Sequence, residues 1–321
     1  MSKNIFSAKH FHDEEAAREW FETARWPDGP VCPFCGSLKH YATKKAGRYR
    51  CGEKECRKDF TVTTKTVMER SHCKLTQWAM AFWLAASSKK GFSAHQLHRA
   101  LGCQYNTAWF LHHRVMEAMR EGGLDVRPFD EAPLGGAGEV VEVDETYIGK
   151  ISQPRTHARA GYPIRKRSGT MDKNTILSLV HRGGKVRSFH VPRATKETVL
   201  KILRDNIAHE SAVHTDESRI YDKLGDFFAS HESVNHSKKE YASGNVTTNT
   251  VEGYFSVFKR GMRGVYQHCS EKHLHRYVAE FDFRFNRREA LGWTDEERCI
   301  AAIRAGDGKR LTYHPVNSER V

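Results

Sequence analysis

Residues 139–148 read EVVEVDETYI, and this stretch decides the fold of the C-terminal half of the chain. Polar and apolar side chains alternate in it with a period of two, which is typical of a β-strand. The alternation places Glu142, Asp144 and Thr146 on one face, and on the other it places Val141, Val143 and Glu145. Burying a carboxylate in a central strand costs free energy unless a cation or a cationic side chain pairs with it. The stretch therefore predicts a polar site built on a sheet.

The residues that follow indicate an α/β domain. The strand pattern recurs at residues 175–181, 186–191 and 211–216, and helix patterns cover residues 195–208, 220–228, 272–288 and the segment from residue 248. Three antiparallel strands, a helix and another strand are typical of a mixed α/β fold.

Carboxylates lie on three of these elements. Asp144 is in the first strand, Asp216 ends a later one, and Glu252 lies on the helix after it, where Asn249 and Lys259 share its face. Clustered carboxylates repel unless Mg²⁺ or Mn²⁺ neutralises them, and two such ions support phosphodiester chemistry. The three acids predict such a site, although each one alone is more often a cap or a surface residue.

Four of the eight cysteines fall within 25 residues near the N-terminus. Cys32 and Cys35 form a Cys-x2-Cys turn, Cys51 and Cys56 form a looser turn, and a short hairpin pattern lies between the pairs. Four thiolates at about 2.3 Å complete a closed tetrahedron around Zn²⁺, and so small a segment has little apolar surface with which to fold otherwise. We expect a structural zinc ribbon; four reduced cysteines in an ordinary fold are the alternative.

A helical block follows the cysteines. Helix patterns cover residues 75–87, 93–101 and 105–120. Ser93 is a natural N-cap and Gly102 a natural stop, and the short turn after Gly102 suggests a helix-turn-helix. We expect this block to contact DNA, with Arg114 of the last helix among the contacts; packing between domains is the alternative.

Charge and composition bound the partners. The chain has 52 Lys and Arg against 39 Asp and Glu, a formal charge of +13, which favours a polyanionic partner. Its longest apolar stretch is far shorter than the roughly 20 residues of a membrane span, and the N-terminus lacks a signal-peptide pattern. We expect a cytoplasmic protein with no membrane partner.

Residues 150–173 form a basic segment that is too charged to be core. We expect Arg165, Lys166 and Arg167 to track DNA phosphates beside the acidic site, because that site needs cations to hold a polyanion. A merely solvated loop is the alternative.

Glycine and proline residues mark the boundary between the two halves. The predicted divisions are a zinc ribbon with an N-terminal helix at 1–70, a helix-turn-helix-like domain at 71–121, a linker at 122–138, the α/β domain at 139–290 and a tail at 291–321.

In combination these motifs resemble those of bacterial insertion-sequence transposases of the fifteen-ninety-five family (ISXO-type). The resemblance spans about residues 15–290 and is carried by the paired cysteines, VDETYIG at 143–149, HTDE at 214–217, NTVEGYFSVFKRG at 249–261 and RYVAEFDFRFNR at 276–287. It implies a ribonuclease-H-like DDE domain, a mixed sheet flanked by helices, that cuts transposon ends and joins 3′-hydroxyls to target DNA with divalent metal.

The resemblance also implies roles. Asp144 and Asp216 become the first two metal ligands and Glu252 the third, while Lys259, with Arg260 beside it, matches a basic residue that contacts the terminal phosphate. Members of the family use Asn or Glu at the third position, so Asn249 remains an alternative; Glu252 is favoured because a carboxylate neutralises Mg²⁺ better than an amide.

The implied partners are double-stranded DNA, as terminal inverted repeats and as target, and further copies of the chain in a homodimer or higher oligomer. A DNA-binding regulator with a silent catalytic domain and a simple nuclease remain alternatives.

Overall fold

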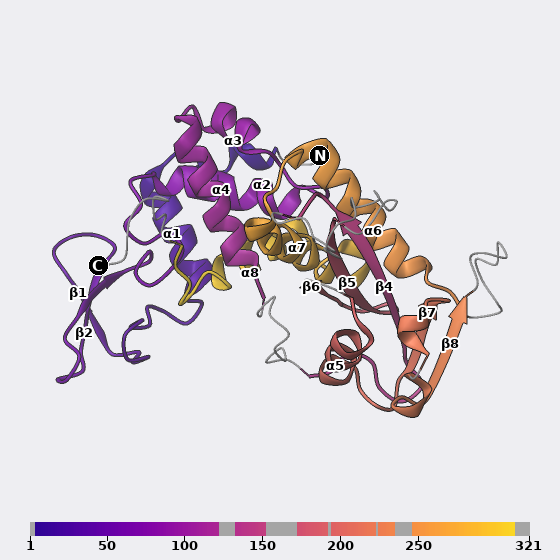
Figure 1. Cartoon of the computed structure of the whole chain (residues 1–321). Coiled ribbons are helices and arrows are strands. Elements are labelled where there is room, and N and C mark those ends of the chain that lie inside the picture. Colours follow the sequence, from indigo (N-terminus) through magenta and orange to yellow (C-terminus); the bar gives the residue numbers. More distant parts are fainter. Residues whose placement is uncertain are drawn as a thin grey trace, which may run out of the picture. The chain divides into compact units, whose positions relative to one another are not determined.

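The computed structural model describes residues 4–121, 132–151, 172–191, 194–222, 224–234 and 246–311. The chain divides into two compact units (Figure 1). The first unit joins Met1–Arg120 with Trp293–Val321, and the second comprises Glu121–Gly292.

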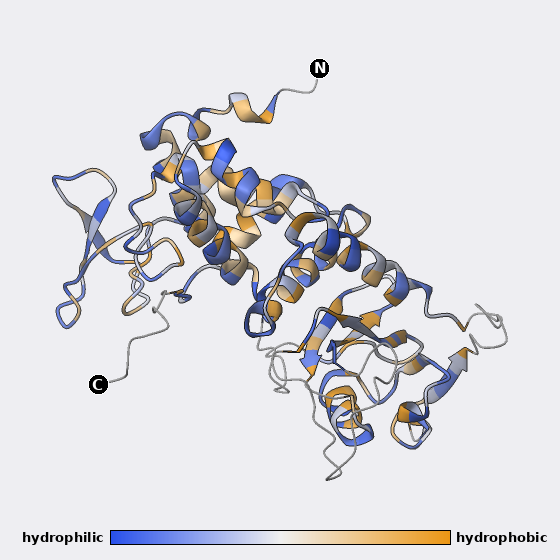
Figure 2. Cartoon of the chain, turned by 45° about the horizontal axis from the view of Figure 1, so that its top comes forward, coloured by the Kyte–Doolittle hydropathy of each residue, from blue (hydrophilic) through white to orange (hydrophobic). Residues whose placement is uncertain are grey.

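The first unit begins with a helix and a small antiparallel sheet. Helix α1 spans Glu14–Arg25, and strands β1, β2 and β3 span His40–Ala42, Arg48–Cys51 and Asp59–Thr61 in the order β1-β2-β3. Figure 2 shows that the hairpin of β1 and β2 is largely hydrophilic. The hairpin predicted between the cysteine pairs is confirmed.

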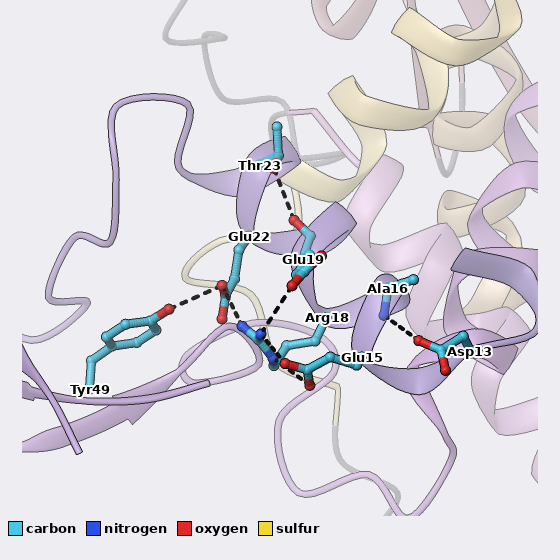
Figure 3. A network of polar contacts seen from close by, with 8 residues as sticks. All are labelled: Asp13, Glu15, Ala16, Arg18, Glu19, Glu22, Thr23 and Tyr49. Carbon is cyan, nitrogen blue, oxygen red and sulfur yellow. Dashed lines mark hydrogen bonds and ion pairs between the residues drawn. The ribbon is translucent and has the colours of Figure 1, made fainter. Parts of the chain in front are cut away.

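Glu22 of α1 joins this hairpin to the helix (Figure 3). Its carboxylate accepts from the Tyr49 hydroxyl of β2 at 3.0 Å and pairs with the Arg18 guanidinium at 2.6 Å. The hairpin turn passes so close that a Cβ on Gly47 would lie 2.2 Å from the Arg18 side chain. Gly47 also has φ +69°, so only glycine fits there without strain.

Four further helices complete the described part of the first unit. They are α2 (Leu75–Ser87), α3 (Ala94–Leu101), α4 (Tyr105–Met119) and α8 (Asp295–Arg304). The predicted caps form: the Ser93 side chain accepts from Gln96 N at 3.1 Å, and Gly102 adopts φ +60°. Helix α8 lies in the segment assigned from sequence to a tail, and its Arg298 and Arg304 donate to Ala86 O and Ala24 O.

The second unit is a five-stranded mixed sheet flanked by helices, as predicted. Its elements are β4 (Val140–Ile148), β5 (Asn174–His181), β6 (Val186–Val191), α5 (Lys196–Asn206), β7 (Ala212–Asp216), β8 (Ser230–Val234), α6 (Asn249–Gly261) and α7 (Glu271–Asn286). The sheet order is β6-β5-β4-β7-β8. β4, β5 and β6 are antiparallel neighbours, whereas β7 and β8 run parallel to β4.

One prediction for this unit is wrong. Residues 220–228 form two short 3-10 turns, Arg219–Tyr221 and Leu224–Asp226, and the fifth strand, β8, follows them. Tyr221, Leu224 and Phe228 have the spacing of a helix face, but they enter the core from the two turns and from position 228, which follows them. Gly225 and Asp226 are weak helix formers, so burial decides the local structure.

The two faces of the sheet have different partners. Val141 and Val143 of β4 pack in the main apolar core with Val199, Ile202 and Leu203 of α5. The alternate residues of β4, including Glu142, face α6, whose first amides bond to that carboxylate. The acidic face of the sheet is therefore covered by the helix that carries Glu252.

Candidate functional site

The four ribbon cysteines converge at one point. The ligand atoms of Cys32, Cys35, Cys51 and Cys56 all lie within 4.8 Å of one another, the one such group of three or more possible metal ligands found in the described residues. Cys32 Sγ lies 3.8 Å from Cys56 Sγ, and Cys35 Sγ lies 3.5 Å from Cys51 Sγ.

These separations fit a zinc ion and not a pair of disulfides. A disulfide joins sulfurs at about 2.05 Å. Four sulfurs each about 2.3 Å from a tetrahedral centre lie about 3.8 Å apart. The cysteines therefore have the spacing of a closed zinc site with four thiolate ligands, which leaves no ligand position for water and is structural in character.

Two of the predicted acids lie on neighbouring parallel strands. β4 and β7 pair from Val140 with Ala212 to Glu142 with His214. Asp144 and Asp216 lie two residues beyond this last pair on their strands, and the charge of Asp216 acts on Asp144. The Asp216 carboxylate accepts from Ser218 N at 3.0 Å, which fixes it where the strand ends.

Asp144 lies in a field of negative charge. Burial, together with the charges of Glu145, Asp216 and Glu252, raises the pKa of Asp144 to about 7, while the hydrogen bond from the Glu145 N–H acts in the opposite direction. The field of Glu252 reaches Asp144 from α6 and that of Asp216 from β7. Carboxylates held together in this way favour a proton or a cation between them, and their oxygens are the ligands that Mg²⁺ prefers.

Glu145 faces away from Asp144, as the alternation predicted. Its carboxylate accepts a hydrogen bond from the buried Tyr221 hydroxyl. Burial also raises the pKa of Glu145. Glu145 therefore has a structural partner of its own, yet it adds to the negative field at Asp144.

The residues of α6 differ in their exposure and in their partners. The Thr248 hydroxyl donates to Glu252 Oε1 at 3.0 Å, which orients that carboxylate. Asn249 is exposed at the first position of the helix. Lys259 lies two turns further on, with its ammonium 6.0 Å from the centre of the Phe255 ring, and Arg260 is exposed and donates to Ser256 O.

One of the predicted DNA contacts, Arg114, is buried. Arg114 is 7% exposed, donates to Glu69 O at 3.2 Å and lies over the Phe110 ring. Such a guanidinium does not reach a phosphate without local rearrangement, so the structure argues against Arg114 as a DNA contact. Arg165, Lys166 and Arg167 lie outside the described residues.

The sequence did not identify the partners of Glu142. Its buried carboxylate accepts from Arg182 Nε at 3.0 Å and from the first turn of α6. The cost of a charge in a central strand predicted a cationic partner, but nothing in the spacing pointed to an arginine in the β5–β6 turn.

Comparison with known proteins places the chain in a family. Residues 133–286 match the ISXO2-like transposase domain, and residues 12–59 match the transposase zinc-ribbon domain. The chain is also 30% identical over 105 residues to an uncharacterized transposase-like protein of Haemophilus influenzae, a match that covers 33% of this chain and 84% of the relative. The chain belongs to this transposase family. In this transposase, the four-cysteine cluster lies in the matched ribbon and the three acids in the matched transposase domain.

Likeness to solved structures is weak. A simian T-cell lymphotropic virus intasome in complex with a PP2A regulatory subunit matches with a TM-score of 0.28 and 13% identity, over 59% of this transposase and 63% of that chain. A pre-cleavage Mos1 transpososome matches with a TM-score of 0.27 and 9% identity, over 67% and 75%. This transposase thus spans under two thirds of the first of these chains.

Within the described ranges, no helix has both the length and the apolar character needed to cross a membrane.

Proposed function

We propose that this transposase binds the terminal inverted repeats of its element, cleaves DNA strands with divalent metal and transfers the 3′-hydroxyl to target DNA. The observation that carries the proposal is that β4, β7 and α6 meet at Glu142, which pairs with His214 and accepts from Thr250 N. Each of these three elements carries one of the acids, and the charges of Asp216 and Glu252 act on Asp144. The mixed sheet order, with a central strand that bears the first acid, supports a ribonuclease-H-like domain.

In this proposal the acids hold the metal and a lysine holds the substrate. Asp144 of β4 and Asp216 of β7 supply ligands, and Glu252 supplies a third from α6. Bound Mg²⁺ or Mn²⁺ would activate the attacking oxygen and stabilise the leaving oxygen of the phosphodiester. Lys259, on the same helix face as Glu252, positions the terminal phosphate.

DNA recognition is assigned to the first unit. The helix pair α3 and α4 is joined by a three-residue turn, and exposed polar residues line its end: His95, Gln96, Arg99, Tyr105 and Asn106. The start of the second helix of such a pair is the part that meets base edges in helix-turn-helix proteins. These residues replace Arg114 in the proposed contact set. Because two ends are processed together, the working form on DNA is a dimer or a higher oligomer.

The test uses a duplex carrying the inverted repeats that flank the coding sequence. Asp144→Ala, Asp216→Ala and Glu252→Ala should each abolish strand cleavage and strand transfer in Mg²⁺, because each removes a ligand and compensating charge. DNA binding measured by gel shift should persist. Cleavage without strand transfer in the wild type would leave a nuclease; binding without either reaction would leave a regulator.

A second comparison tests the third ligand. Asn249→Ala should keep most of the activity, because Asn249 is exposed and Glu252 is the residue whose charge acts on Asp144. Lys259→Ala should reduce the rate without abolishing it, because the metal ligands remain. Loss of strand transfer in Asn249→Ala together with near-normal Glu252→Ala would contradict the assignment of Glu252.

A further inference from the structure

Glu142 is a completely buried carboxylate in the central strand. Its Oε2 accepts from Thr250 N at 2.7 Å and Val251 N at 3.0 Å, and its Oε1 accepts from Thr250 Oγ1 at 2.9 Å and Arg182 Nε at 3.0 Å. A buried charge is tolerated only when it is paired and hydrogen-bonded, and here donors of Thr250, Val251 and Arg182 surround the carboxylate.

Two of these donors belong to the open end of α6. Thr250 and Val251 are the second and third residues of the helix, and their N–H groups are those that an N-cap side chain normally satisfies. Thr248 occupies the N-cap position but makes no side-chain cap bond; its hydroxyl donates to Glu252 instead. A carboxylate that lies 108 residues earlier in the chain thus caps the helix, at the end where the helix dipole favours negative charge.

Arg182 extends this connection to the other elements of the site. Besides Glu142, its guanidinium donates to Thr247 O and to His214 Nδ1, each at 3.3 Å. Thr247 lies just before α6, and His214 lies on β7 two residues before Asp216. One buried polar network therefore contacts each of the three elements that carry the acids.

We propose that Glu142 is a positioning residue that holds the first turn of α6, and so Glu252, in register with Asp144. Glu142 and Asp144 are two residues apart on one strand face, about 6.6 Å along the strand. Glu252 directly follows Val251, whose amide Glu142 holds. A shift of about 1 Å in a catalytic geometry can cost about 100-fold in rate. The role rests on the proposed function, since it concerns the geometry of the same three acids.

The experiment compares Glu142→Gln with a matched control, Glu280→Gln. Glu280 is also completely buried and paired with an arginine, Arg284, and it accepts from the Tyr266 hydroxyl, so its replacement removes a similar buried charge from the same unit. Mn²⁺ binding to the zinc-loaded full chain is measured by electron paramagnetic resonance of the free ion, without DNA. Metal-dependent nicking of a supercoiled plasmid that carries the flanking repeats is measured in parallel.

Glu142→Gln should weaken Mn²⁺ binding about tenfold and raise the half-saturating metal concentration for nicking by a similar factor, whereas Glu280→Gln keeps the wild-type midpoints. A merely structural role lowers the folded fraction and the amplitude but leaves the midpoints unmoved. Equal midpoints in the wild type, Glu142→Gln and Glu280→Gln would therefore overturn the proposal.

Thr250 keeps the test decisive if Glu142→Gln does not fold. Thr250→Val removes the hydroxyl donor to Glu142 with little change of shape, and should weaken Mn²⁺ binding in the same direction, while Thr250→Ser, which keeps the hydroxyl, restores it. An unchanged midpoint in Thr250→Val would then count against the role of Glu142.

Measurements on the wild type distinguish failure of the role proposed for Glu142 from failure of the proposed function. A wild-type chain that binds Mn²⁺ but does not nick the plasmid refutes the proposed reaction, and the Mn²⁺ comparison still decides the role of Glu142. A wild-type chain that binds no Mn²⁺ refutes both.

Discussion

Asp282 should make the free energy of unfolding of the second unit depend on pH, and Asp282→Asn should remove that dependence. The residue lies on α7, where its carboxylate accepts from Ser188 N and Ser188 Oγ of β6, each at 2.8 Å, and from the Tyr254 hydroxyl of α6. Burial raises the pKa of Asp282 to about 7, although these three hydrogen bonds act in the opposite direction. The protonated acid is therefore the form that the fold favours.

The sign and size of the effect follow from proton linkage. An unfolded aspartate has a pKa of about 3.9, so between about pH 4 and pH 7 the folded chain holds a proton that the unfolded chain has lost. The free energy of unfolding then falls as pH rises through this window. A difference of about 3 pH units at about 1.4 kcal/mol each corresponds to about 4 kcal/mol at most. Asp282→Asn is neutral at every pH and should lose this slope.

The distribution of tryptophans provides an internal control. All six lie in residues 20–109 and at 293, within the first unit, and none lies in the second. Urea unfolding followed by tryptophan fluorescence therefore reports on the first unit, and far-ultraviolet circular dichroism reports on both. From pH 5 to pH 8, the urea midpoint of the second unit should fall more in the wild type than in Asp282→Asn. The midpoint detected by fluorescence should be the same in both proteins. Parallel pH slopes for the second unit in the two proteins would refute the assigned pKa shift.

Two further predictions concern the first unit. Replacing both Cys32 and Cys35 with Ser should lower the zinc content from about one ion per chain to none by elemental analysis, and full occupancy in that variant would contradict the four-cysteine site. Truncation after Gly292 should destabilise the first unit by more than about 3 kcal/mol, because it removes the buried Cys299 and Ile303 side chains of α8; unchanged fluorescence-detected unfolding would contradict this.

Periodicity in the sequence predicted most of the elements because their burial follows their local pattern. The alternation over 139–148 predicted which side of β4 is apolar, and those valines do pack on α5. Ser93 and Gly102 predicted both ends of α3 because capping is a local interaction. The pattern failed at 220–228, where the core takes up apolar side chains from two short turns.

The sequence predicted the three acids of the candidate site but not the residues that hold them in place. Asp144, Asp216 and Glu252 stood out by residue type and by their place on successive elements. The partners of Glu142 depend on contacts across 40 and 108 residues, which no local pattern encodes. Arg114 was predicted to be accessible to DNA because it is basic and lies on a helix. The sequence of that helix does not show which of its faces the tertiary structure buries.

The two acids on one face of β4 show how the same residue type serves two purposes. Glu142 is surrounded by the Arg182 guanidinium and by donors of the first turn of α6, so its charge is compensated within the protein. For Asp144, the described residues supply one backbone donor, the Glu145 N–H, together with three acidic neighbours. The strand thus places one compensated carboxylate next to one that is not. The hydrogen bonds to Glu142 hold the first turn of α6 in place. Asp144 has no such compensation from the described residues, so a cation can neutralise its charge. Of these two acids on β4, Glu142 therefore supports the helix and Asp144 is available to bind metal.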